Sequence, residues 1–161
     1  MSDFTRFSGE VMTSYALTES RILDTDLWRV MKGFRYYVGD KDSNKWVDVP
    51  RGYLVDGASV PRIIWGLIPP WGRYGAATIV HDILCEYLSL TLDGRPCKIT
   101  REQADNILFE AMRVLAVDAE QYKLIQTGVN TYRHLYSVTQ PVWSRRKAEL
   151  EANWVKCNPE T

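Results

Sequence analysis

Cysteine and histidine are scarce in this sequence, and neither sign of charge dominates it. The 161 residues include three cysteines and two histidines, and 20 basic side chains balance 20 acidic ones, giving a formal net charge of +0. Without a net positive field, nucleic acid is not an expected partner, although neutral net charge does not exclude a local basic patch. Because Cys85, Cys97 and Cys157 are odd in number and lack metal-ligand spacing, we expect free thiols. A Cys85–Cys97 disulfide is the less favoured alternative.

Long hydrophobic runs are missing as well. Residues 1–6 show no basic region followed by an apolar run, so no signal peptide is expected. No apolar stretch approaches the roughly 20 residues that a transmembrane helix requires. The composition, with 45% hydrophobic and 25% charged residues, is instead typical of a globular domain, and its aromatic content is high at six Trp and nine Tyr.

The order of the local patterns predicts an α+β fold in one domain spanning residues 1–161. Strand signals dominate residues 1–60, a Gly/Pro/Trp-rich loop covers residues 61–73, and helical periodicity covers residues 74–161. We expect the strands to form a small antiparallel meander, with a break at Gly33. Their expected ranges are residues 11–16, 27–38, 45–49 and 53–55.

Four helices are predicted after the loop. Their expected ranges are residues 74–88, 100–115, 119–136 and 141–156, with a turn-rich connector at residues 91–96. Thr100 and Gln103 have the spacing of a capping box, which marks the start of the second helix. Trp143, Leu150 and Trp154 make a sparse apolar edge on the last helix, and they are the candidate partner-binding residues if this edge docks on a partner rather than on the core.

His81 and Asp82 are the strongest candidates for chemistry. If the helices over residues 74–88 and 100–115 pack antiparallel, Asp105 can approach His81. An Asp that accepts a hydrogen bond from one imidazole nitrogen sets the tautomer and leaves the other nitrogen as a base. The alternative for His81 is a core histidine bonded to a backbone carbonyl. His134, the second histidine, is expected to be structural or exposed.

The segment Asp-Gly-Ala-Ser-Val-Pro-Arg at residues 56–62 has two interpretations. In the structural one, Asp56 accepts local amides, Ser59 caps the turn, and Arg62 pairs with Asp56 or Asp82. In the catalytic one, Ser59 is a nucleophile with His81 as its base. No Gly-x-Ser-x-Gly elbow supports the catalytic interpretation.

A metal site is a further possibility. Asp82 points about 100° around the helix from His81, so it is available to hold a hard cation. Carboxylate-rich sites favour calcium, with magnesium or manganese next, over zinc. The candidate ligands are Asp82 and Asp56, which His81 and Asp105 could join. Five neighbouring residues are expected to contact a substrate or to support the site: Arg62, Trp65, Trp71, Arg73 and Tyr74.

The runs Ala-Ala-Thr-Ile-Val-His-Asp at residues 76–82 and Ala-Asp-Asn-Ile-Leu-Phe at residues 104–109 resemble the helical site of secretory-type and parvovirus-capsid phospholipases. The resemblance implies that His81 activates water, Asp82 holds calcium and Asp105 orients His81. A cysteine stands near the place where those enzymes usually carry Tyr. Their disulfides and Gly-rich calcium loop have no recognisable counterpart.

The middle of the chain also resembles a domain family of unknown function that is common in tailed bacteriophages and prophages. The similar residues are Val-Asp-Gly-Ala-Ser-Val-Pro-Arg, then Gly-Arg-Tyr, His-Asp and Arg-Glu-Gln-Ala-Asp, within roughly residues 34–115. The resemblance implies a phage protein, located in the virion or the host bacterial cytoplasm. Residues 117–161 are expected to lie outside the family's domain.

Two functions follow as expectations. The first is a metal-assisted hydrolase acting on a lipid or ester bond of the host envelope. The second is a non-catalytic virion, tail or accessory protein that binds other phage proteins, or itself, through its aromatic surface and its last helix.

Overall fold

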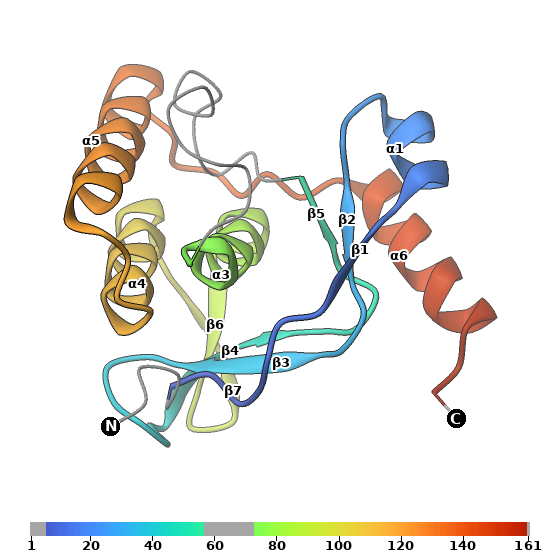
Figure 1. The fold of residues 1–161 in the computed structure, drawn as a ribbon, viewed down its shortest axis with the longest axis horizontal. Helices are drawn as coiled ribbons and strands as arrows, with labels where there is room; N and C mark the ends of the chain where they lie inside the picture. The colour runs from blue at the N-terminus through green and yellow to red at the C-terminus, as the bar shows by residue number, and fades with distance from the viewer. Residues whose placement is uncertain (1–5, 57–72, 161) are drawn as a thin grey trace.

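The computed structural model describes residues 6–56 and 73–160, and its fold is α+β as predicted. Figure 1 shows the helices α4 and α5 on one side of the molecule, α1 and α6 on the other, and α3 between them. In chain order the elements are β1 (Thr13–Tyr15), α1 (Leu17–Leu23), β2 (Trp28–Val30), β3 (Phe34–Tyr37), β4 (Lys45–Val49), β5 (Leu54–Val55), α3 (Gly75–Tyr87), β6 (Ser89–Leu92), β7 (Arg95–Lys98), α4 (Arg101–Val114), α5 (Ala119–Tyr136) and α6 (Arg145–Cys157).

The described strands pair antiparallel, and they divide into two sheets. One sheet has the order β1-β2-β5 and the other β3-β4-β6-β7. The division falls at Gly33, between β2 and β3, where a Cβ atom would lie 3.2 Å from the backbone nitrogen of Arg51 and 3.3 Å from the carbonyl oxygen of Val49. Because glycine has no Cβ, the chain can pass this close and leave one sheet for the other.

A β-hairpin occupies the connector between α3 and α4. Strand β6 pairs with β7 and also with β4, so the hairpin extends the sheet built by the first third of the chain. Asp93 and Gly94 make its turn with φ values of 52° and 75°. An Asp-Gly pair between alternating residues is a strong hairpin signal, and it identifies this turn in the sequence. Helix α1 was not predicted either. It follows β1, the strand that lies within the predicted range of residues 11–16.

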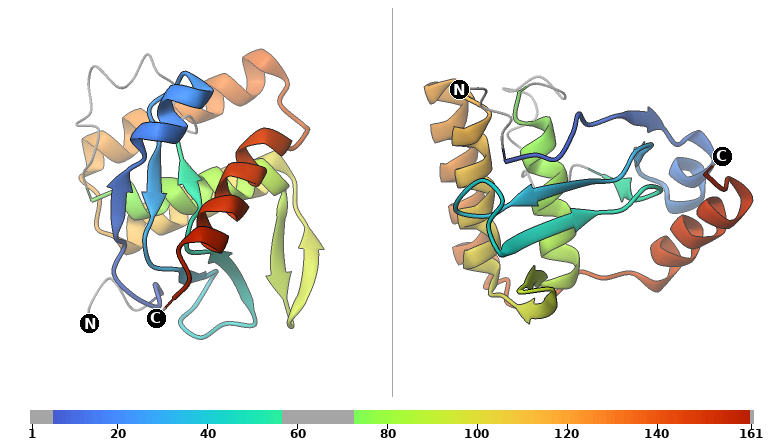
Figure 2. Two further views of the ribbon diagram at one scale, coloured as in Figure 1. Left: turned by 90° about the vertical axis from the view of Figure 1, so that its right-hand side faces the viewer. Right: turned by 90° about the horizontal axis from the view of Figure 1, so that it is seen from below.

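Helix α3 lies at the centre of the molecule, between α4 and the sheets (Figure 2). Eleven of its residues are buried, from Gly75 to Glu86. The main hydrophobic cluster draws side chains from both sheets and from α3, α4 and α5. Burial on nearly every face explains why α3 consists largely of apolar and small residues, and it makes the polar residues of α3 the unusual ones.

The helix boundaries agree well with the local signals. Thr100 and Gln103 form the predicted capping box at the start of α4. Helix α5 covers the predicted residues, and the Asp118 side chain accepts hydrogen bonds from backbone amides of its first turn. The cysteines Cys85, Cys97 and Cys157 are free, as expected. Within residues 6–56 and 73–160, no helix combines the length and apolar character needed to cross a membrane.

Helix α6 docks on the chain itself, although none of its residues is buried. Leu150 packs against a small cluster of Ala16, Leu27 and Leu54. The guanidinium groups of Arg29 and Arg51 lie 4.5 and 4.6 Å from the centroid of the Trp154 ring. Two of the three candidate partner-binding residues are therefore engaged within the chain, and Trp143 alone of the three is exposed.

Candidate functional site

Helices α3 and α4 bring His81 and Asp105 together. The backbone nitrogen of Ile99 donates to the carbonyl oxygen of Leu88, just beyond the facing ends of the two helices. Further along each helix, His81 Nε2 lies 2.7 Å from Asp105 Oδ1. These successive contacts show that α3 and α4 pack antiparallel. Antiparallel packing was the condition under which Asp105 was expected to approach His81.

Two arginines hold Asp105 in place. Arg101, one turn before it in α4, lies with Nε 3.3 Å from Oδ1, and Arg133 of α5 lies with Nη1 2.6 Å from Oδ2. Burial by itself raises the pKa of Asp105, but the interaction with His81, the charge of Arg101 and the hydrogen bond from Arg133 outweigh it and lower the pKa below its ordinary value. Asp105 is therefore ionised near neutral pH.

The ionised carboxylate sets the tautomer of His81. A carboxylate only accepts, so Nε2 must donate the proton of the 2.7 Å hydrogen bond, which leaves the lone pair of a neutral imidazole on Nδ1. Burial is the largest influence on the pKa of His81 and lowers it, which favours the neutral form. His81 Nδ1 is buried and has no hydrogen-bond partner among the described residues. A buried acceptor in this state costs about 1–3 kcal/mol and calls for a functional or structural explanation.

Cys85 completes a compact group with the pair. Its Sγ lies 3.4 Å from His81 Nε2, and the possible metal-ligand atoms of His81, Cys85 and Asp105 all lie within 4.8 Å of one another. Burial raises the pKa of the Cys85 thiol, so the group is protonated rather than a thiolate nucleophile.

The fit of this group to a metal ion is poor. Its donor set of imidazole, thiol and one carboxylate suits a borderline or soft metal, whereas calcium prefers six to eight oxygen ligands. Both oxygens of Asp105 already accept hydrogen bonds, and Arg101 and Arg133 place positive charge beside any incoming cation. Among the described residues, the carboxylates of Asp56 and Asp82 are not part of a group of three or more potential ligands.

A pocket of about 240 Å³ lies beside the buried group. Asp82, Cys85 and Glu86 of α3 form one wall, so Cys85 links the imidazole of His81 to the pocket. The complete lining is Tyr53, Asp56, Asp82, Cys85, Glu86, Arg101, Tyr132, Val142 and Lys147. Asp56 and Asp82, the two expected metal ligands, therefore share a pocket, while His81 has 0% exposed surface and lies behind its wall.

Glu86 and Lys147 were not identified from the sequence. Glu86 Oε2 accepts a hydrogen bond from the Tyr53 hydroxyl and another from Lys147 Nζ, each at 2.7 Å. Lys147 Nζ also lies 4.1 Å from the centroid of the Tyr53 ring. Since Glu86 and Lys147 are 61 residues apart, no local pattern connects them. The one sequence signal is a glutamate inside a helix of mostly apolar and small residues.

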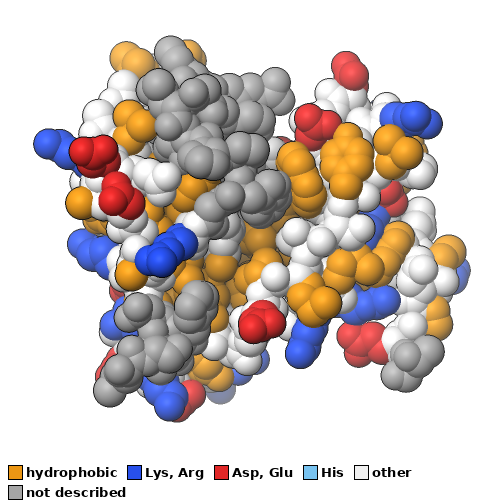
Figure 3. Space-filling view, viewed as in Figure 1, with side chains coloured by type: hydrophobic (Ala, Val, Ile, Leu, Met, Phe, Trp, Pro, Cys, Tyr) orange, Lys and Arg blue, Asp and Glu red, His pale blue; other side chains and the backbone are white. Residues whose placement is uncertain are grey.

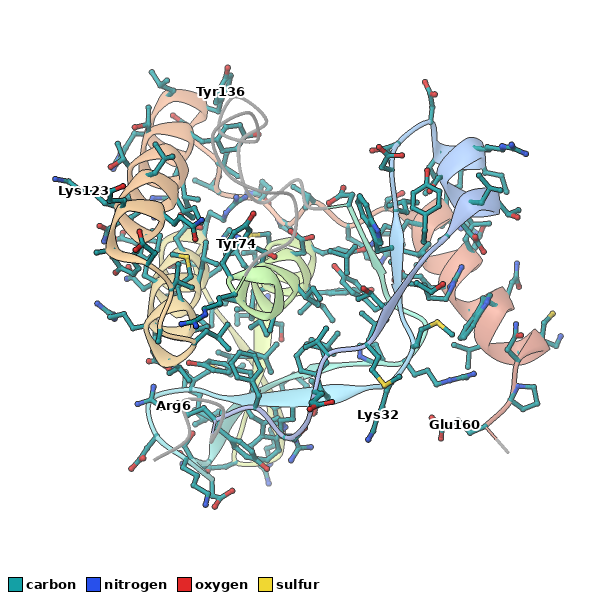
Figure 4. The ribbon with its side chains drawn as sticks, viewed as in Figure 1. Arg6, Lys32, Tyr74, Lys123, Tyr136 and Glu160 are labelled. Carbon is teal, nitrogen blue, oxygen red and sulfur yellow. The ribbon has the colours of Figure 1, made fainter. Side chains whose placement is uncertain are left out.

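The remaining predicted site residues have different positions. Tyr74 is buried beside the first turn of α3 (Figure 4), and burial raises its pKa. Arg73 is exposed, with Nη1 3.5 Å from the carbonyl oxygen of Ala116. Ser59, Arg62, Trp65 and Trp71 lie outside the described residues. The hypothesis that Ser59 is a nucleophile therefore stays a prediction.

Fold and site together define an α+β domain with a buried His–Asp pair next to a polar pocket. The chain belongs to the family described as protein of unknown function DUF1353, whose model matches residues 28–129. This match extends past Val117, the expected limit of the family's domain, into α5.

An uncharacterized protein, y4jT, of Sinorhizobium fredii (strain NBRC 101917 / NGR234) is 44% identical over 54 residues, which make up 32% of this chain and 16% of that protein. The chain thus spans a small part of this relative's length. No solved structure matches the chain.

Proposed function

We propose that this chain is a phage-encoded accessory protein with a hydrolase-type site that acts on a lipid or ester bond of the host envelope. The observation that carries the proposal is the state of His81: its Nε2–H is committed to Asp105, and its Nδ1 lone pair has no partner among the described residues. The phage origin is supported by the sequence resemblance within residues 34–115.

The proposal gives each residue of the buried group a defined role. In the proposed step, His81 Nδ1 removes a proton from a water molecule, and the resulting hydroxide attacks the carbonyl carbon of the ester. The imidazolium that forms is stabilised by Asp105, which Arg101 and Arg133 keep ionised. The proton then passes from His81 to the leaving alkoxide. A neutral imidazole is the form that this step needs, and burial favours it.

The proposal also includes a divalent cation that Asp56 and Asp82 would help to bind. Calcium is the first candidate, with magnesium and manganese next, and the supporting observation is that Asp56 and Asp82 line one pocket. The other ligands would come from solvent or from elsewhere in the chain.

The test combines metal titration with hydrolysis assays. Calorimetric titration of the metal-stripped protein with calcium, magnesium and manganese should show binding that Asp82→Asn abolishes and that Asp48→Asn, on the exposed surface of β4, leaves unchanged. Phospholipid and cell-wall esters are then screened with the wild-type protein. His81→Gln keeps an amide donor for Asp105 but has no base, so it should lose activity by a factor of about 10²–10⁴ while remaining folded. Equal activity of His81→Gln and the wild type would remove His81 as the base.

A non-catalytic role is the second candidate, and two observations favour it. His81 and Asp105 have 0% exposed surface, as a purely structural pair would. Large apolar side chains are also exposed near the end of α5 and in the segment that follows it: Tyr132, Leu135, Tyr136, Val142 and Trp143. Figure 3 shows that hydrophobic side chains are exposed in several places on the face it presents. Under this candidate, substitution of His81 changes stability alone and no hydrolysis is found.

A further inference from the structure

Glu86 is a buried carboxylate that the proposed hydrolytic step does not use. Its residue is 4% exposed, and it lies in the wall of the pocket beside Asp82 and Cys85. Oxygen Oε2 is engaged by Tyr53 and Lys147. Oxygen Oε1 is buried and has no hydrogen-bond partner among the described residues. An acceptor of this kind, next to a pocket, is suited to a ligand that brings a donor.

The surroundings of Glu86 indicate the type of donor. Lys147 shows that this carboxylate accepts an ammonium group, since its Nζ lies 2.7 Å from Oε2 and above the Tyr53 ring. The pocket is lined by three carboxylates, Asp56, Asp82 and Glu86, and by the ring of Tyr132. Its two cations, Arg101 and Lys147, balance two of these carboxylates, so one negative charge is in excess. Carboxylates and aromatic faces together favour a cation with N–H groups over a neutral donor.

The size of the pocket limits the ligand further. Its volume of about 240 Å³ lies below the roughly 300–1,000 Å³ that is usual for pockets holding drug-sized molecules. A headgroup or an amino-acid residue matches this volume, and a long acyl chain exceeds it. The long part of a substrate would have to remain outside the pocket.

We propose that this pocket binds the protonated primary amine of a ligand, and that Glu86 Oε1 accepts a hydrogen bond from that amine. The inference rests on the proposed function and deepens it, because it names the class of substrate as one carrying an ammonium group. Two sources share this chemistry: an ethanolamine headgroup of a lipid and the α-amino group of a peptide.

The test measures binding of small probes to the full chain by calorimetry. Glycerophosphoethanolamine represents the headgroup, and alanyl-alanine amide represents the peptide. Glycerophosphocholine keeps the positive charge but has no N–H, and N-acetyl-alanyl-alanine amide loses the charge. We expect one of the two amines to bind, and its blocked counterpart to bind about tenfold more weakly or not at all. The amine that binds identifies the source.

Glu86→Gln should weaken binding of that amine by about tenfold to a hundredfold, because a charge-assisted hydrogen bond is lost. Glu149→Gln is the matched control, since Glu149 forms an exposed ion pair with Arg145 on α6. Thermal unfolding checks that both variants are folded. If Glu86→Gln does not fold, the comparison of free and blocked amines on the wild-type protein tests the inference instead.

No binding of either amine, equal binding of the blocked probes, or unchanged binding by Glu86→Gln would overturn the inference. Its failure can be distinguished from failure of the proposed function. Amine binding without any hydrolysis would support the amine pocket and contradict the hydrolase. Hydrolysis that depends on His81, without amine binding, would support the hydrolase and contradict the amine pocket.

Discussion

At the scale of single residues, Asp105 connects three helices through its two oxygens. His81 of α3, Arg101 of α4 and Arg133 of α5 all bind this carboxylate, which has 0% exposed surface. Two buried or half-buried guanidiniums therefore depend on one negative charge. Removing one member of such a group leaves the others without compensation, and that is much more costly than never having buried them.

We therefore expect Asp105→Asn to lower the free energy of unfolding by about 3–5 kcal/mol. The control is Asp48→Asn, the same substitution in an exposed ion pair with Arg35, which should cost at most about 1 kcal/mol. Urea-induced unfolding measures both. Similar losses in the two variants would show that Asp105 has no special part in joining the helices.

The state of His81 predicts how stability depends on pH. Its pKa is lowered from 6.5 in the folded protein, so the unfolded chain binds a proton that the folded chain does not. The stabilisation is present above the unfolded pKa and is lost as the pH falls from about 6.5 toward the folded pKa, with a slope of at most about 1.4 kcal/mol per pH unit. Chemical unfolding between about pH 5 and 8 measures this slope. His81→Gln should remove it and His134→Gln, on the exposed side of α5, should retain it; the same slope in both variants would contradict the assignment.

At the scale of elements, α6 is attached mainly by polar contacts and by one close approach. The backbone nitrogen of Leu54 donates to Glu151 Oε2 at 2.8 Å, and Arg51 Nη1 donates to the carbonyl oxygen of Asn158 at 2.7 Å. Val155 lies against Gly52, where a Cβ atom would be 2.6 Å from Val155 Cγ2. The surface that receives α6 thus requires glycine at position 52.

Gly52→Ala should release α6. Gly52 has φ +93°, and an alanine there would add backbone strain to the clash with Val155, whose β-branched side chain has few alternative rotamers in a helix. Gly39→Ala is the matched control, because Gly39 has φ +87° and no atom within 4 Å of the added Cβ. The control should lose about 1–2 kcal/mol from strain alone. Limited proteolysis should cleave near α6 faster in Gly52→Ala than in Gly39→Ala, and equal cleavage would show that α6 does not need this contact.

At the scale of the whole molecule, packing is distributed unevenly. Helix α3 has eleven buried residues, whereas α6 has none. The family model covers residues 28–129 and so ends before α6. Segments with few buried apolar contacts open at lower free energy than the core to which they are attached.

Hydrogen exchange should therefore show two levels of protection. We expect backbone amides of α6 to exchange well before those of α3 and α4, through opening of α6 while the core stays folded. Mass spectrometry of peptides from each helix measures this. Equal protection of α6 and α3 would mean that α6 unfolds only with the whole chain, despite its lack of buried residues.

Some features of this protein were determined by the sequence itself, because their signals are local. The capping box at Thr100 and the bounds of α5 depend on residues within one or two turns, and the glycine itself marks the break at position 33. The pairing of His81 with Asp105 could also be predicted, since consecutive helices usually lie side by side and antiparallel packing across their connector brings these two residues together. The hairpin at Asp93-Gly94 had a local signal that the sequence interpretation did not use.

Other features were decided only by the tertiary structure. Arg133 reaches Asp105 across 28 residues, and Lys147 reaches Glu86 across 61. Hydrophobic periodicity indicates which face of a helix is buried, but it does not indicate which distant polar side chain meets that face. That choice depends on how α5 and α6 pack against α3 and α4. For the same reason the sequence pointed to His81 and Asp105, while the burial of this pair, its two arginines and the pocket around Glu86 emerged only from the packing of the helices.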